Sequence, residues 1–255
     1  MLKILYEKTL FWYNFAMERQ KIKLLGFRID SFGFEEAIDF AKDLIEAKQS
    51  AQVVTINPEM IEYALKHPDF ADVLDNADLV IPDGVGVKLG LKIKGFNVER
   101  IAGIEFSFRM LQECAKNKFP VALIGARPHI LNKTVENLKT QIQDLNVIYS
   151  QNGYFQDREK ILKELKDKSP RFVLVALGSP RQEEFIIEAR KLLPKALMIG
   201  VGGSFDVWAG EAQRAPEVFQ KLGLEWFYRT LKEPKRFKRI FPTLPRFLLR
   251  VIFSH

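Results

Sequence analysis

The sequence predicts an α/β fold: a largely parallel, Rossmann-like sheet with flanking helices, followed by a short basic helical appendage at the C-terminus. Apolar runs alternate along the chain with amphipathic stretches, which is the pattern of strands connected by helices. Several of these runs are apolar throughout, as expected for strands covered on both faces. The 255 residues suffice for one large α/β domain.

The expected strands are short, largely apolar segments, several of which are followed directly by glycine, proline or polar residues. They are Lys23–Ile29, Gln52–Ile56, Asp78–Ile81, Val121–Ile124, Val147–Tyr149, Phe172–Leu177 and Ala196–Val201. The helices expected between them have apolar residues at helical spacing. They are Phe34–Ala47, Pro58–Lys66, Ile104–Asn117, Pro128–Asp144, Arg158–Lys166 and Gln182–Leu193. Such a sheet places ligands at the carboxyl ends of its strands.

The positive charge of the chain is concentrated at its C-terminus. Residues 229–255 contain eight basic residues and one acidic residue, which accounts for the whole net charge of +7. Residues 1–228 hold 31 basic and 31 acidic residues and are therefore neutral. We expect a catalytic domain over residues 1–222, with residues 1–20 as an N-terminal extension. Residues 223–255 would form a basic-aromatic appendage, in which Pro234, Pro242 and Pro245 separate short helical pieces.

Two polar turns follow apolar strands in the first half of the chain. Asn57 precedes a proline, so it fits either a helix N-cap or a polar strand end that lines a pocket. Asp83 precedes Gly84 and Gly86, and the two glycines would allow a ligand to approach the backbone closely. Asp83 itself fits a turn residue, a general base or a group that binds a sugar hydroxyl.

Two further turns lie in the second half. Ser179 and Gln182 could form a capping box at the start of a helix. A capping box does not require Arg181, and an arginine beside an amide suits phosphate or sugar recognition. Gly202 and Gly203 follow a strand and could present backbone N–H groups to a diphosphate, which a nearby arginine, Arg214, could neutralise. A glycine-rich turn with a surface arginine is the simpler interpretation.

Other function classes have weaker support. The spacing of Gly84, Gly86 and Gly90 resembles part of a dinucleotide-binding motif, so an NAD(P)-dependent oxidoreductase is one alternative. That motif also requires a strand that ends in an acidic residue about 20 residues later, and no such strand follows here. A non-catalytic adaptor at a membrane surface is another. The chain has one cysteine, three scattered histidines and no Asp-x-Asp pair, so we expect no metal cofactor.

The motifs together resemble the WecG/TagA/CpsF family of bacterial glycosyltransferases. The segments that carry this resemblance occur in the family's order: Thr55–Glu59, Pro82–Gly86, Glu99–Gly103, Leu177–Glu183, Gly202–Asp206, Ala209–Pro216, Gly223–Arg229 and Glu233–Arg236. The resemblance implies inverting transfer of an N-acetylmannosamine-type sugar from UDP to N-acetylglucosamine on a polyprenyl diphosphate. It also implies that the product belongs to teichoic acid, common antigen or capsule synthesis. Residues 1–20 precede the usual start of the family.

Inverting transfer requires a base and a site for the leaving diphosphate. The expected catalytic residues are Asp83, as the base, and Gln182. Substrate binding is expected from residues of the shared motifs and of the appendage: Thr55, Asn57, Gly84, Gly86, Arg100, Gly202, Gly203, Asp206, Arg214, Arg229, Arg236 and Arg239.

The expected partners follow from the same resemblance. They are a UDP-sugar donor, a polyprenyl-diphosphate-linked acceptor and a membrane surface contacted by residues 229–255, without nucleic acid and with a possible homo-oligomer. Aromatic and aliphatic residues alternate with basic ones in that segment, and we expect Phe241, Phe247 and Leu248 to insert at the interface. No apolar run is long enough to span a bilayer, so we expect a cytoplasmic protein that is peripheral on the inner face of the membrane.

Overall fold

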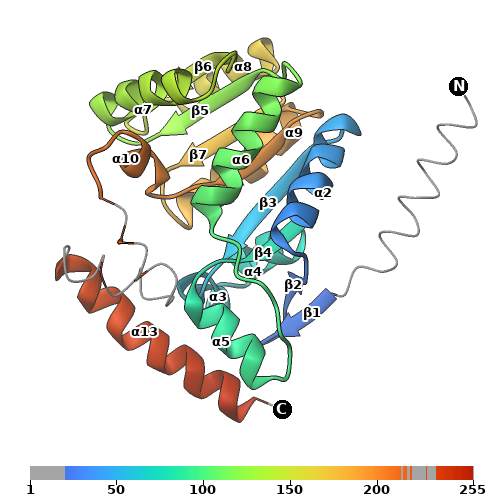
Figure 1. Ribbon diagram of the computed structural model, residues 1–255, viewed down its shortest axis with the longest axis vertical. Helices are drawn as coiled ribbons and strands as arrows, with labels where there is room; N and C mark the ends of the chain where they lie inside the picture. Colours follow the sequence, from blue (N-terminus) through green and yellow to red (C-terminus); the bar gives the residue numbers. More distant parts are fainter. Residues whose placement is uncertain (1–20, 214, 217–218, 220–227, 229–233, 255) are drawn as a thin grey trace, which may run out of the picture.

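The computed structural model describes residues 21–213, 215–216, 219, 228 and 234–254, with the side chains of residues 234–241 excepted. Its centre is a six-stranded parallel sheet with the strand order β4-β3-β8-β7-β5-β6 (Figure 1). The strands are β3 (Ala51–Ile56), β4 (Leu79–Pro82), β5 (Val121–Gly125), β6 (Val147–Gln151), β7 (Phe172–Ala176) and β8 (Leu197–Gly200). The predicted α/β fold is confirmed.

Helices cover both faces of this sheet because alternate strand residues point to opposite sides. One face packs against α2 (Phe34–Glu46), α6 (Gly103–Lys116), α7 (Pro128–Gln141) and α10 (Ser204–Trp208). The helices on the side of the other face are α3 (Pro58–Ala64), α4 (Pro68–Asp75), α5 (Val85–Ile93), α8 (Arg158–Lys168) and α9 (Arg181–Leu192), and α13 (Pro234–Phe253) packs against α3 and α5. Both faces of β3, β4, β5, β7 and β8 are therefore buried, as the apolar runs predicted, while the edge strand β6 is largely half-buried.

The first expected strand, Lys23–Ile29, is wrong in one respect: the chain reverses within it. β1 (Lys21–Leu24) pairs with β2 (Phe27–Asp30) as an antiparallel hairpin outside the main sheet. Leu25 and Gly26 form the turn with φ values of 53° and 92°. Two successive residues with positive φ give the turn whose twist matches that of a hairpin.

The C-terminal segment is also more regular than predicted, because α13 is continuous through Pro242 and Pro245. A proline removes one backbone hydrogen bond from a helix interior, and here the packing of an apolar face offsets that loss. Phe247 and Val251 of this helix are fully buried against the core formed by α3 and α5. A Cβ atom at Gly90 would lie 3.2 Å from the Phe247 ring, so the glycine allows this approach. Phe247 is therefore a core residue, and its predicted insertion into a membrane is wrong.

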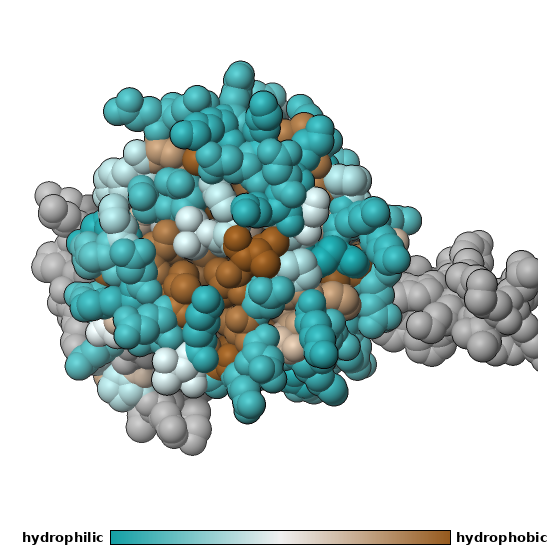
Figure 2. Space-filling model, turned by 90° about the horizontal axis from the view of Figure 1, so that it is seen from above, coloured by the Kyte–Doolittle hydropathy of each residue, from teal (hydrophilic) through white to brown (hydrophobic). Residues whose placement is uncertain are grey.

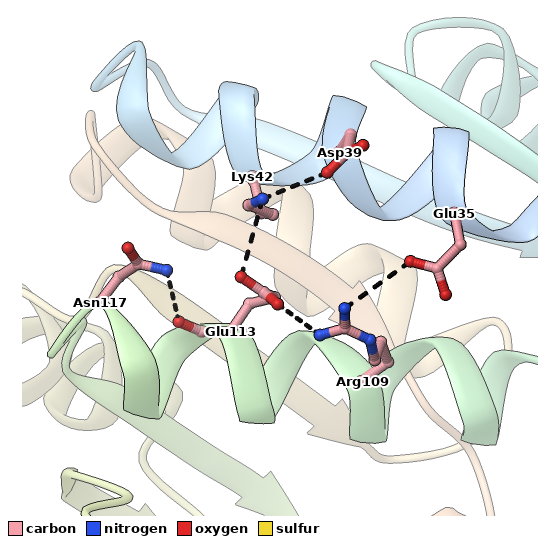
Figure 3. Close-up of polar contacts among 6 residues, drawn as sticks. All are labelled: Glu35, Asp39, Lys42, Arg109, Glu113 and Asn117. Atoms are coloured by element: carbon pink, nitrogen blue, oxygen red, sulfur yellow. Dashed lines mark hydrogen bonds and ion pairs between the residues drawn. The ribbon is translucent and has the colours of Figure 1, made fainter.

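An ion-pair network connects α2 with α6 on the outer surface of the first helix layer (Figure 3). The Lys42 ammonium lies 3.2 Å from Asp39 and 3.7 Å from Glu113, while the Arg109 guanidinium contacts both Glu113 and Glu35. Burial disfavours the charged Glu113 carboxylate, but the Arg109 hydrogen bond and the Lys42 charge lower the pKa of Glu113 below its ordinary value. The network holds α6 in place, and the first turn of α6 reaches the candidate site.

The side of the molecule that faces away from α13 has a mixed surface. Figure 2 shows this side, which is the top of the molecule in Figure 1. Hydrophilic side chains there surround a central hydrophobic area. The candidate site described next does not lie on this side of the molecule; it lies at the carboxyl ends of the strands, close to α13.

Candidate active site

A pocket of about 460 Å³ lies at the carboxyl ends of β3, β4, β7 and β8, which are neighbours in the sheet. The turns that follow these strands form most of its wall. Nine of the residues predicted from the sequence line it together: Thr55, Asn57, Asp83, Gly84, Gly86, Arg100, Gln182, Gly202 and Gly203. The sequence thus identified the residues of one pocket from segments far apart in the chain.

Three helices of eight or more residues begin at this pocket. Gly84 precedes α5, Ala102 precedes α6, and Ser179 lies two residues before α9; all three line the pocket. The helix dipole adds partial positive charge at such an end, although some of the first N–H groups already donate within the protein: Gly103 to Asp83, and Gln182 to the Gly178 carbonyl. Together with the Arg100 side chain, these helix ends make the pocket suitable for an anionic group such as a diphosphate.

The Asp83 carboxylate is oriented by the backbone at the starts of two of these helices. The Gly84 N–H donates to Asp83 Oδ1 at 2.7 Å, and the Gly103 N–H lies 3.4 Å from Oδ2. Gly84 has a φ of 79°, which favours glycine, and a Cβ at Gly103 would lie 2.9 Å from Thr55 Cγ2. Both glycines are therefore needed to bring the carboxylate and Thr55 to the same wall of the pocket.

Asn57 combines the two roles that its sequence position allowed. Its Oδ1 accepts a hydrogen bond of 3.1 Å from the Met60 N–H, so it caps α3. The residue also lines the pocket. The cap orients the side chain, and the amide nitrogen is then the group that can donate to a ligand.

Gln182 is held by hydrogen bonds within the protein. Its Oε1 accepts from the Gly202 N–H at 3.0 Å, and its Nε2 donates to Glu183 Oε1 at 2.7 Å. A Cβ at Gly200 would lie only 2.4 Å from Gln182 Nε2, so that glycine leaves room for the amide. This geometry makes Gln182 a positioning residue for the Gly202–Gly203 turn. A direct catalytic role for Gln182 stays a prediction.

Glu183 is a buried acidic residue that sequence reasoning did not single out. It is 3% exposed, and burial raises the pKa of its carboxyl to about 7. The sequence could have indicated this burial, because Glu183 falls on the same side of the predicted helix as the apolar residues Ile186 and Ala189, where a glutamate is unusual. Through Gln182 it supports the wall of the pocket.

The buried carboxyl of Glu183 predicts a pH-dependent stability. Its pKa is higher in the folded state than in the unfolded chain, so the folded state binds more protons and loses stability as the pH rises from about 4.5 to about 7. Between pH 5 and pH 8, we expect wild type to lose about 2 to 3 kcal/mol in free energy of unfolding relative to Glu183→Gln. Urea unfolding of both proteins at the two pH values measures this difference. Parallel pH profiles would contradict it.

The remaining predicted residues lie elsewhere or outside the described residues. Asp206, in α10, does not line this pocket and forms an ion pair of 3.3 Å with Arg127. Arg214 and Arg229 lie outside the described residues. Arg236 and Arg239 belong to α13, but their side chains lie outside the described part of the structure. The same helix reaches the pocket through Thr243 and Leu244, which the sequence did not indicate.

Comparison with known proteins establishes the class of protein to which this fold and pocket belong. The chain belongs to the glycosyl transferase WecG/TagA/CpsF family, whose pattern it matches over residues 22–255. It is 37% identical over 212 residues to the N-acetylglucosaminyldiphosphoundecaprenol N-acetyl-beta-D-mannosaminyltransferase of Bacillus subtilis strain 168. That alignment covers 83% of this chain and 82% of the relative.

A second relative with the same name, from Bacillus spizizenii strain W23, is 35% identical over 209 residues. The alignment covers 82% of this chain and 81% of that protein. The family inferred from the sequence motifs is confirmed, and the comparisons give no support to an oxidoreductase or an adaptor. The family match begins after residues 1–20, which the sequence analysis set apart as an extension.

Proposed function

We propose that this protein transfers an N-acetylmannosamine-type sugar from UDP to N-acetylglucosamine carried on a polyprenyl diphosphate, with inversion. The proposal depends above all on one observation: the Asp83 carboxylate lies in the pocket where the N-termini of α5, α6 and α9 converge. A base and an anion-binding site are then adjacent, as glycosyl transfer requires. The names of the relatives supply the sugar and the lipid.

In the proposed reaction, Asp83 accepts the proton of an acceptor hydroxyl. The hydroxyl oxygen then forms a bond to the anomeric carbon of the donor sugar, on the side opposite the nucleotide. The bond between that carbon and the diphosphate oxygen breaks, and UDP departs with the electron pair. Arg100 and the helix N-termini stabilise the negative charge on the departing diphosphate.

A donor screen tests the proposal. The full-length protein is supplied with an N-acetylglucosamine diphosphate that carries a short, water-soluble lipid, and UDP release is followed. We expect release with UDP-N-acetylmannosamine or with its uronic acid relative, and none without the acceptor. Absence of acceptor-dependent release with every UDP-sugar would refute the proposed function.

Catalysis is further proposed to need no metal ion. The support is that the pocket itself supplies positive charge, from Arg100 and from three helix N-termini. We therefore expect the initial rate of UDP release in excess EDTA to stay within about two-fold of the rate without EDTA. Loss of a group that stabilises the leaving diphosphate would lower the rate far more, by about 10² to 10³-fold. Loss of activity in EDTA that Mg²⁺ or Mn²⁺ restores would show that a metal ion is required.

Membrane contact is proposed through exposed hydrophobic residues at one end of α5 and α13. We call these residues the apolar surface: Leu89, Ile93, Phe96, Leu249, Ile252 and Phe253. Lys94, just after α5, donates a hydrogen bond to the carbonyl of Ser254, so the two helix ends lie together, as Figure 1 also shows. Lys88 and Lys92 are exposed basic residues of the same α5, and a mixture of basic and apolar side chains is typical of binding to an anionic bilayer surface.

This apolar surface replaces the inserting residues expected from the sequence. Phe247 is buried, Leu248 packs partly against the core, and the Phe241 side chain lies outside the described residues. Among the described helices, none is sufficiently long and apolar to cross a membrane. Peripheral attachment on the inner face and a homo-oligomer both stay predictions.

A further inference from the structure

A groove of about 360 Å³ continues the main pocket between α3 and α13. Asn57, Met60, Ser179 and Thr243 line both cavities, so a bound molecule could extend from one into the other. The family match and the proposed reaction do not assign this groove to any substrate. Its volume lies in the range of small-molecule binding sites.

One wall of the groove carries an aromatic platform on α3 and the turn that follows it. The Tyr63 ring stacks on the His67 ring at 3.9 Å between centroids and meets Phe70 edge-on at 5.1 Å. These contacts fix the Tyr63 ring although 37% of the residue is exposed. A rigid, partly exposed aromatic ring can pack against the apolar face of a sugar with little loss of side-chain entropy.

Basic side chains lie on both walls. Lys66 follows α3, and Arg246 belongs to α13; both are exposed and line the groove. Two acidic residues also line it: Glu62, whose carboxylate pairs with Arg250 at 3.0 Å, and Glu59, at the border with the main pocket. The Glu62 charge is thus compensated by Arg250, and Lys66 and Arg246 are the positive charges available to an anionic ligand that enters from solvent, with the Glu59 charge at the inner end of the groove.

We propose that this groove binds the N-acetylglucosamine diphosphate of the acceptor, with the sugar beside Tyr63 and the diphosphate between Lys66 and Arg246. This inference rests on the proposed function. The donor would then occupy the main pocket, and the acceptor hydroxyl would reach past the junction at Asn57 and Ser179 into that pocket, where Asp83 lies. Two basic side chains on opposite walls suit a diphosphate, because each can bind one phosphate group.

The direction of α13 supports this orientation. Residues 246, 249 and 253 follow each other at intervals of three and four, so they share one face of the helix. Phe253 lies about 10 Å along the axis from Arg246, at a rise of ~1.5 Å per residue. The polar head of the acceptor at Arg246 would therefore place its lipid along the face that carries Leu249 and Phe253, which belong to the apolar surface.

The test uses the full-length protein and the same short-lipid acceptor, with two readouts: calorimetric binding of the acceptor, and KM for acceptor and donor separately. We expect Lys66→Ala/Arg246→Ala to raise the Kd and the KM for the acceptor by about ten-fold or more, since each lost charge-assisted contact has an effect of that order. The KM for the UDP-sugar should stay within about two-fold. Lys163→Ala/Lys195→Ala removes two exposed lysines outside the groove and serves as the matched control.

The outcomes separate this inference from the proposed function. If the double variant raises the KM for the donor instead, or changes neither constant, the groove is not the acceptor site. If wild type does not bind the acceptor, the inference is likewise overturned. If wild type binds the acceptor but transfers no sugar to it, the proposed function fails, while the Kd of the variant still decides the role of the groove.

Discussion

Asp83→Asn is expected to lower the turnover number by about 10² to 10⁴-fold, the range associated with loss of a general base. Asparagine keeps an oxygen that can accept the Gly84 N–H, so the turn before α5 should persist. It cannot accept the proton of the acceptor hydroxyl, because a neutral amide is a very weak base. Single-turnover transfer to the short-lipid acceptor measures the chemical step, and calorimetry with UDP measures the donor site.

We expect UDP to bind Asp83→Asn nearly as tightly as wild type, since the helix N-termini and Arg100 are unchanged. Asp69→Asn, which neutralises an exposed aspartate on α4, is the matched control and should turn over normally. Near-normal turnover in Asp83→Asn would exclude the base role. Equal losses of UDP binding and turnover would instead mean that Asp83 supports the structure of the pocket.

The pocket residues could be predicted from the sequence because their signals are local. In a parallel sheet every strand ends at the same edge, so a polar or glycine-rich turn after a buried strand is brought beside the others by the fold itself. Asn57, Asp83, Gln182 and Gly202 all lie within a few residues of a strand end or a helix start. No knowledge of long-range contacts was needed to place them together.

Interactions between distant segments could not be predicted in this way. Three prolines in the C-terminal segment indicated a broken helix, but the burial of Phe247 and Val251 against α5 maintains a continuous one. Phe247, which the sequence suggested would insert into a membrane, is therefore a core residue. Gly90 likewise resembled part of a nucleotide motif, while its place in the structure is beneath the Phe247 ring.

The positioning role of Gln182 was hidden for a related reason. Its sequence position at the start of a helix indicated a ligand-facing amide, but the glycine turn that it holds comes twenty residues later in the chain. The role of Glu183 likewise depends on its place in the structure, where its buried carboxyl accepts a hydrogen bond from the Gln182 amide. Sequence patterns therefore located the site, and packing determined which of its residues face a ligand and which support those that do.

The apolar surface gives the second large expected effect. Leu249, Ile252 and Phe253 are 54%, 53% and 75% exposed. Burying that much of each side chain in a bilayer interface stabilises binding by about 1 kcal/mol per residue. Replacing all three with serine should therefore weaken binding to vesicles of anionic phospholipid by about 100-fold. Co-sedimentation with such vesicles measures the loss.

The same triple serine variant should keep the wild-type turnover number when the short-lipid acceptor is saturating, but it should transfer sugar poorly to a polyprenyl acceptor embedded in vesicles. The reason is that these three side chains lie five or more residues beyond Thr243 and Leu244, which reach the pocket, towards the C-terminal end of α13. Leu249→Ile/Ile252→Leu/Phe253→Leu keeps the surface hydrophobic and should retain both vesicle binding and transfer. Removing the whole segment would be less informative, because Phe247 and Val251 belong to the core. If the serine variant still binds vesicles, or loses activity on both acceptors equally, the apolar surface is not a membrane contact, and α13 serves only to complete the active site.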